Sequence, residues 1–282
     1  MAQDEFQQRA RRWLSAYKQE VLGVAEDGIW LRNGKRYSHI LPQEKYRLSI
    51  LPSFRDQFWE WFGKQRPRIQ LHSDFHHLNS SQALCFNLFF PPMMGDGHEL
   101  AQFSSVMGIA GVPNAEASFE FQPSPTEGTC IDFSMLLRSG GRVNFEIKYT
   151  ESEFGSAKAD PAHLDKFESI YKSRLAERFE ESFCCAAQFL ENYQIARNVW
   201  HLNESAGDIA IFLFPNENTR LRKYEALIKG CALEPFRSRI RVVYLEDLIL
   251  NLFKELNPNE TAGRLHLEEF RAKYLPFVKM AR

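Results

Sequence analysis

Residues 130–151 read CIDFSMLLRSGGRVNFEIKYTE, and this stretch decides the fold class. Apolar and polar residues alternate in it on both sides of a glycine pair, Gly140 and Gly141. Successive side chains of a β-strand point to opposite faces, so the alternation predicts strands over residues 130–137 and 142–150. The glycine pair between them predicts the turn of a hairpin.

The polar residues of this hairpin are expected on one face. In the second strand Phe145 and Ile147 point one way, while Glu146 and Lys148 point the other. In the first strand the same parity places Asp132 on the face opposite its apolar neighbours. If the apolar faces of both strands share one core, then Asp132, Glu146 and Lys148 share the other face.

Two carboxylates and a lysine on adjacent strands can carry a defined chemistry. Asp132 and Glu146 can hold a Mg²⁺ ion that keeps waters and a substrate phosphate in its other positions. Lys148 can then position a water or stabilise developing negative charge. The alternative interpretation is an ordinary exposed pair of Glu146 and Lys148, worth about 0–1 kcal/mol, because strands with a solvent-facing side commonly carry such residues.

The composition is that of a folded protein of the α/β or α+β class. A chain of 282 residues with 44% hydrophobic residues can bury a sizeable core, which excludes general disorder. The formal net charge of -1 gives no bulk attraction to phosphate, so contacts with nucleic acid require local clusters of lysine and arginine. Five cysteines without a CxxC pair indicate neither a disulfide framework nor a cysteine zinc site.

The sequence gives no indication of a targeting or membrane segment. Its first residues lack the apolar core of a signal peptide, and no later run is apolar for about 18 residues. No membrane partner is therefore expected, and the cytoplasm is the expected location.

The remaining secondary structure follows from periodicity and from helix-breaking residues. The run NSSQALCFNLFF predicts a buried helix over residues 79–90, with Asn79 or Ser80 as its N-cap and the Pro91-Pro92 pair ending it. The other expected elements are, in order, helices over 6–21 and 53–64, a strand over 117–122, the hairpin, one or two amphipathic helices over 163–201, a strand over 208–214, a helix over 222–230, a strand over 241–245 and a closing helical region through Phe277.

The order of these elements, with three residues in it, resembles a known superfamily. Asp132, followed after a short turn by Glu146-Ile147-Lys148 in an α-β-β-β-α-β order, resembles the core of the PD-(D/E)xK nucleases. The stretches HSDFHHLNSSQALCFNLFFP and FEIKYTESEFG are similar to a branch identified as restriction endonucleases. The chain departs from the pattern at one position, because Ile131 stands where the superfamily has a proline before its aspartate.

The resemblance implies an α/β fold with a mixed central sheet flanked by helices and a restriction-endonuclease-like core over roughly residues 79–215. We expect a single domain over residues 1–282, with an N-terminal helical region at about 1–78 and a C-terminal extension at about 216–282.

The same resemblance implies a Mg²⁺-dependent DNA endonuclease, with Mn²⁺ able to replace Mg²⁺, acting in restriction or defence. Asp132 and Glu146 would bind the metal ion, and Lys148 would be the positively charged catalytic residue. In this superfamily a further acidic or amide residue often comes from the first helix or strand, and Gln82 and Glu120 are the candidates. The expected partner is duplex DNA, and a homodimer is expected for an enzyme that reaches two bonds.

Two further functions stay open at this point. A nuclease-like fold can serve as a non-catalytic DNA-binding or assembly module. His72, His76 and His77 could instead form a zinc hydrolase site, since His72 and His76 would share a face of a helix, or they could simply pack near a helix N-terminus.

Polar residues outside the hairpin also have two interpretations each. Arg197 and Asn198, in YQIARNVW, could brace the active site or form a cationic helix C-cap. The basic clusters could track a phosphate backbone or be solvated faces; they are RLRK (220–223), RSRIR (237–241) and the helical group Lys172, Arg174 and Arg178.

Overall fold

The computed structural model of the chain describes residues 5–66, 68–95, 97–111, 113–256 and 260–277. The chain divides into two compact units: unit 1 is drawn from Met1–Ala110 and Tyr244–Arg282, and unit 2 from Gly111–Val243. The boundaries of these units differ from those of the regions expected from the sequence. The helix Ser81–Met94 was expected in the same core as the sheet, but it belongs to unit 1. A single domain over the whole chain stays a prediction.

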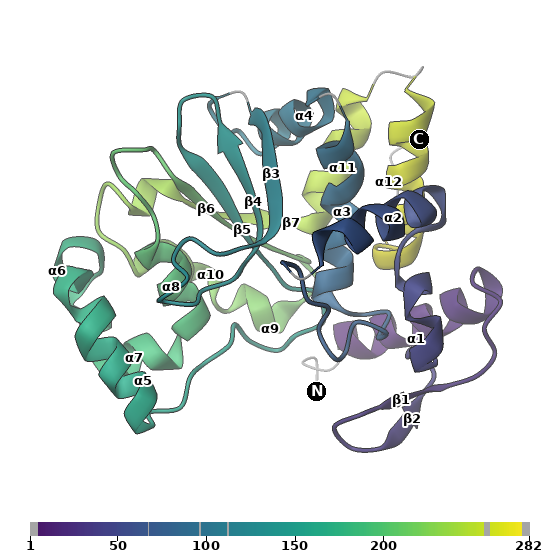
Figure 1. Cartoon of the computed structure of the whole chain (residues 1–282), viewed down its shortest axis with the longest axis horizontal. Helices are drawn as coiled ribbons and strands as arrows, with labels where there is room; N and C mark the ends of the chain where they lie inside the picture. Colours follow the sequence, from purple (N-terminus) through teal and green to yellow (C-terminus); the bar gives the residue numbers. More distant parts are fainter. Residues whose placement is uncertain (1–4, 67, 96, 112, 257–259, 278–282) are drawn as a thin grey trace. The chain divides into compact units, whose positions relative to one another are not determined.

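Unit 2 is built on a five-stranded sheet in the order β3-β4-β5-β6-β7 (Figure 1). β3 pairs antiparallel with β4 and β4 with β5, whereas β5 and β6 are parallel, so the sheet is mixed. The expected α/β class, the mixed central sheet flanked by helices and the α-β-β-β-α-β order are confirmed. The strands are β3 (Pro113–Phe121), β4 (Ile131–Leu137), β5 (Arg142–Ile147), β6 (Ile209–Phe214) and β7 (Ile240–Tyr244).

The predicted parity of the hairpin is confirmed by contacts on each face. Phe133 and Phe145 are paired across β4 and β5, and their ring centroids lie 5.7 Å apart on the apolar face. On the other face Ser134 Oγ donates to Asn144 Oδ1 at 2.8 Å. Every residue of β6 is buried, so the sheet is covered on both faces at this strand.

The two glycines of the turn between β4 and β5 have different roles. Gly140 has a φ of +94°, a conformation that residues with a Cβ rarely adopt, and a Cβ there would meet nothing within 4 Å. A Cβ on Gly141 would lie 2.4 Å from the carbonyl oxygen of Ala206. The first glycine therefore permits the turn, and the second permits close packing.

The predicted long helical segment over 163–201 is broken into short pieces, which corrects the expectation of one or two helices. The chain leaves the helix at Phe179, whose backbone is extended and forms a bridge with Ala232, and again at Cys185. The helices of unit 2 are α5 (Pro161–Lys166), which continues as a π-helical turn over Phe167–Tyr171, α6 (Leu175–Arg178), α7 (Ala186–Glu191), α8 (Tyr193–Trp200), α9 (Thr219–Arg222) and α10 (Glu225–Gly230).

The described part of unit 1 is mainly helical and also contains a small antiparallel hairpin, β1 (Gly28–Trp30) with β2 (Lys35–Tyr37). It contains the helices expected at both ends of the chain. No helix in the described part of the chain is long and apolar enough to cross a membrane. The helices are α1 (Glu5–Glu20), α2 (Arg55–Gln65), α3 (Ser81–Met94), α4 (His98–Val106), α11 (Leu245–Glu255) and α12 (Thr261–Tyr274).

Helix α3 begins as predicted and ends later than predicted. Ser80 is the N-cap, and its hydroxyl accepts from the Ala83 N–H at 3.3 Å. The helix runs through Pro91 and Pro92 to Met94, so the prediction that the prolines end it was wrong. Pro91 cannot donate to the carbonyl of Asn87, but His266 Nε2 lies 2.7 Å from that oxygen and satisfies it, which makes the proline tolerable.

Candidate active site

The hairpin brings Asp132, Glu146 and Lys148 together at the ends of β4 and β5. Asp132 Oδ2 accepts a hydrogen bond from the backbone N–H of Ile147 at 2.7 Å. The carboxylate thus replaces a backbone carbonyl as the acceptor at the point where β4 and β5 separate. Lys148 Nζ donates to Glu146 Oε1 at 2.7 Å. Beyond β5, Lys148 N–H still bonds to Leu213 O at 3.0 Å, which fixes the lysine backbone against β6.

Glu146 and Lys148 are buried and Asp132 is half-buried, which overturns the interpretation as an exposed surface pair. Glu146 is 4% exposed and Lys148 is 8% exposed. Burial alone would lower the pKa of Lys148, but the charges of Glu146 and Asp132 outweigh it and raise that pKa. Burial, and next the charge of Glu146, raise the pKa of Asp132 well above its usual range. The two carboxylates thus crowd one ammonium group, and the site favours additional positive charge.

Glu120 is adjacent to this group, whereas Gln82 is used elsewhere. Glu120 has a φ of +50°, accepts from Cys130 Sγ at 2.9 Å, and contributes to raising the pKa of Asp132. Gln82 belongs to unit 1, where its Nε2 donates to Gln70 O and its Oε1 accepts from His72 N–H, both at 2.9 Å. Four of the five candidate residues are therefore neighbours in unit 2, and the amide of Gln82 braces a turn of unit 1.

Helix α8 contacts the site directly. Asn198 Nδ2 donates to Glu146 Oε2 at 2.9 Å and to the carbonyl of Gln194, one turn earlier, at 3.0 Å. Both oxygens of Glu146 consequently accept a hydrogen bond, one from Lys148 and one from Asn198. Of the two interpretations of Asn198, the one in which it braces the site agrees with this contact.

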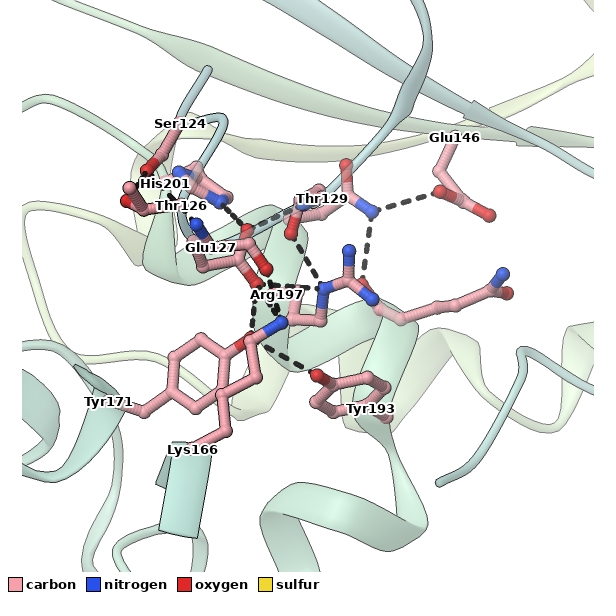
Figure 2. Close-up of polar contacts among 12 residues, drawn as sticks. Ser124, Thr126, Glu127, Thr129, Glu146, Lys166, Tyr171, Tyr193, Arg197 and His201 are labelled. Carbon is pink, nitrogen blue, oxygen red and sulfur yellow. Dashed lines mark hydrogen bonds and ion pairs between the residues drawn. The ribbon is translucent and has the colours of Figure 1, made fainter. Parts of the chain in front are cut away.

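A second buried carboxylate, Glu127, lies beside α8 and is the centre of Figure 2. It is 2% exposed. Burial by itself would raise its pKa, but hydrogen bonds from His201, Thr129 and Tyr171 and the charge of Arg197 hold the pKa well below its usual range. The polar groups that contact it are Thr129 N (2.7 Å), His201 Nε2 (2.7 Å), Arg197 Nε (3.2 Å), Lys166 Nζ (3.3 Å) and the Tyr171 hydroxyl.

We call these residues the Glu127 cluster: Glu127, Thr129, Lys166, Tyr171, Arg197 and His201. Sequence reasoning missed it, because its members are separated by up to 74 residues and follow no spacing that a motif could reveal. The only partial signal was Arg197, a charged residue on a helix that otherwise packs.

The histidine cluster does not have the predicted geometry. The segment that contains His72 and His76 forms turns and not a helix, so these residues do not share a helical face. His76 Nε2 lies 3.1 Å from the carbonyl of Ile29 and is used in local packing. Within the described ranges no group of three or more His, Cys, Asp or Glu side chains is arranged to hold a metal ion.

The donor set of the hairpin fits a hard divalent cation that retains water. Mg²⁺ is typically bound by one or two carboxylates plus waters and substrate phosphates, so a group of three protein ligands is not required. Each oxygen of Glu146 accepts one hydrogen bond and keeps a further lone pair, because a carboxylate offers about four acceptor sites. The residues that would hold Mg²⁺ are Asp132 and Glu146.

Not all of the basic clusters are available for contacts with phosphate. Arg178 is 4% exposed and donates to the carbonyls of Trp200 and Leu202, so its place in a phosphate-tracking cluster was wrong. Lys172 pairs with Glu168 on the surface. Arg222 and Lys223 are exposed and remain candidates for a backbone contact.

The chain was compared with known proteins at three levels. No curated protein and no solved structure matched it. One protein family, described as restriction endonuclease associating with ARP, matches residues 10–275, which is nearly the entire chain. The chain therefore belongs to this restriction endonuclease family.

Proposed function

We propose that the protein is a Mg²⁺-dependent endonuclease that hydrolyses phosphodiester bonds of duplex DNA, with Mn²⁺ able to replace Mg²⁺, in restriction or another defence role. The observation that carries the proposal is the group of half-buried Asp132 with buried Glu146 and Lys148 on one face of a hairpin, in a chain of a restriction endonuclease family. Two crowded carboxylates attract a divalent cation, and the family association supports DNA as the substrate.

Asp132 and Glu146 would hold the cation, which supplies a Lewis acid at the phosphoryl oxygen and lowers the pKa of a bound water. The hydrogen bond from Ile147 N–H orients Asp132, and the bonds from Lys148 and Asn198 orient Glu146. Both carboxylates are thus fixed before the cation binds, and little reorganisation is needed.

Lys148 would act as a charge stabiliser. When no cation is bound, the charges of Glu146 and Asp132 outweigh burial and raise the pKa of Lys148, which favours the protonated ammonium group. A protonated lysine donates hydrogen bonds and stabilises negative charge. Its role in the proposed reaction is therefore to orient the attacking water or to stabilise the charge that develops on the phosphate.

The proposal is tested by incubating the protein with supercoiled, linear, methylated and unmethylated DNA in Mg²⁺, Mn²⁺ or EDTA. We expect metal-dependent nicking or linearisation of closed circular DNA, which requires an endonuclease because the circle has no ends. Lys148→Ala should abolish cleavage, whereas Lys172→Ala, a change of an exposed lysine paired with Glu168, should not.

A wild-type protein that binds DNA but cuts none of these substrates would contradict the proposal and favour the non-catalytic binding or assembly module. The predicted homodimer is tested in the same preparation by sedimentation with and without duplex DNA.

A further inference from the structure

Asn198 of α8 is buried beside Glu146, and of its two side-chain polar atoms only the nitrogen has a hydrogen-bond partner among the residues that the structure describes. The residue is 3% exposed. Its Nδ2 carries two hydrogens, and these are committed to Glu146 Oε2 and Gln194 O. Its Oδ1 is buried and has no hydrogen-bond partner among the described residues. A buried polar atom of this kind is uncommon in a folded protein and calls for a physical explanation.

The orientation of this amide is determined by its neighbours. A flipped amide would place Oδ1 against two acceptors, Glu146 Oε2 and Gln194 O, and lose both hydrogen bonds. The nitrogen must therefore face Glu146, and the oxygen is left as an acceptor next to a residue of the proposed metal site.

Helix α8 is held in place by the Glu127 cluster, so Asn198 is a fixed support. Arg197 of α8 and His201, the C-cap residue that directly follows this helix, both contact Glu127. Glu127 lies in the segment that leads into β4, five residues before Asp132, and Arg197 Nε also donates to Thr129 Oγ1 at 2.6 Å. α8 is thereby tied to the chain that carries Asp132 and, through Asn198, to the strand that carries Glu146.

We propose that Asn198 is a positioning residue of the metal site: its N–H fixes the Glu146 carboxylate, and its Oδ1 accepts a hydrogen bond from a water bound to the divalent cation. This inference rests on the proposed function, because it assigns a role to Asn198 at the same metal site. A water bound to a divalent cation is a strong hydrogen-bond donor, and donation to Asn198 Oδ1 would satisfy the buried acceptor.

The test measures cation binding by calorimetry, with Ca²⁺ as the probe so that no reaction occurs. Asn198→Leu should weaken Ca²⁺ binding 10- to 100-fold, the usual effect of removing a hydrogen-bond partner of a metal ligand. Asn192→Leu is the matched control: Asn192 is also buried (4% exposed) and donates to the carbonyl one turn earlier, Gln188 O, at 3.1 Å, and no contact with Glu146 is described. The control should bind Ca²⁺ as the wild type does.

Asn198→Asp separates positioning from a merely structural role. The aspartate keeps the shape of the side chain but adds a negative charge and removes the donor to Glu146. We expect tighter Ca²⁺ binding, because more ligand charge raises affinity, together with slower Mg²⁺-dependent DNA cleavage, because Glu146 is no longer held. A residue that only stabilises the fold would not move binding and cleavage in opposite directions.

The outcomes distinguish this inference from the proposed function. Wild-type binding that depends on Glu146 but is unchanged in Asn198→Leu would overturn the role of Asn198 and leave the nuclease proposal standing. A wild type that binds no Ca²⁺ would overturn both. If Asn198→Leu does not fold, as judged by circular dichroism, Asn198→Asp decides, and unchanged binding and cleavage in that variant would overturn the inference.

Discussion

Replacing Lys148 with methionine should strongly destabilise unit 2 when no divalent cation is present. The change keeps an unbranched side chain and removes the ammonium group that lies 2.7 Å from Glu146 Oε1. Glu146, which is 4% exposed, would then remain buried beside Asp132 without this counter-charge. Removing one partner of a buried ion pair costs about 3–5 kcal/mol, and we expect the free energy of unfolding to fall by about this amount in EDTA at pH 8.

The loss of stability in Lys148→Met should depend on pH and on the presence of a divalent cation. Burial and the charge of Glu146 raise the pKa of Asp132, and Lys148 opposes that rise, so methionine raises this pKa further. The folded state then binds more protons than the unfolded chain, and stability falls as pH rises from the usual aspartate pKa of about 4 through the raised value. Ca²⁺ at 100 times its Kd should raise the free energy of unfolding of the variant by about 2.7 kcal/mol.

The measurement is urea unfolding of wild type and Lys148→Met at pH 5 and pH 8, each in EDTA and in Ca²⁺. Lys172→Met is the control, because Lys172 forms a surface pair with Glu168 and should change stability by no more than about 1 kcal/mol. The reasoning is refuted if Lys148→Met matches the control in EDTA, or if saturating Ca²⁺ does not raise the free energy of unfolding of Lys148→Met.

Three further predictions concern other parts of the molecule. Gly140→Ala should lower the free energy of unfolding by about 1–2 kcal/mol, because of the positive φ at this position alone. Gly141→Ala should lower it more, because its Cβ would lie 2.4 Å from Ala206 O. The urea midpoints of the two variants show which is the less stable. Burial lowers the pKa of His266 to about 4, so the unfolded chain binds a proton at a higher pH than the folded protein does. The free energy of unfolding should therefore fall by about 3 kcal/mol as pH drops from 6.5 to 4. His266→Leu should show less of this pH dependence in the same unfolding assay. Glu127→Gln keeps the shape of the side chain but leaves Lys166 and Arg197 without their counter-charge. Thermal unfolding should show that the free energy of unfolding falls by about 3–5 kcal/mol. Thr126→Ala, a change of an exposed neighbour, is the control and should not show this loss.

The hairpin could be predicted from the sequence because its information is local. A period of two sets which residues share a face, and the glycine pair sets the turn, so Asp132, Glu146 and Lys148 were brought together without knowledge of distant contacts. The burial of Glu146 and Lys148 could not be predicted, because it depends on helix α8, whose Asn198 lies 52 residues after Glu146. The same alternation is compatible with an exposed face or a covered one.

The errors in helix boundaries arose where tertiary contacts override local preference. Pro91 of α3 is tolerated because His266, which lies 179 residues after Asn87, bonds to the Asn87 carbonyl to which a proline cannot donate. The segment over 163–201 is periodic in sequence, but the bridge of Phe179 with Ala232 interrupts it. In both cases the deciding partner is remote, and no window of neighbouring residues contains it.

The proposed function requires that Asp132 and Glu146 are the ligands of a catalytic cation. The most direct measurement is the initial rate of plasmid nicking as a function of Mg²⁺ concentration for wild type, Asp132→Asn and Glu146→Gln, with DNA binding measured in parallel. We predict a saturable Mg²⁺ dependence in the wild type and a rate at least about 100-fold lower in both variants, with DNA binding retained. Nicking that persists in EDTA, or variants that nick at the wild-type rate, would contradict it.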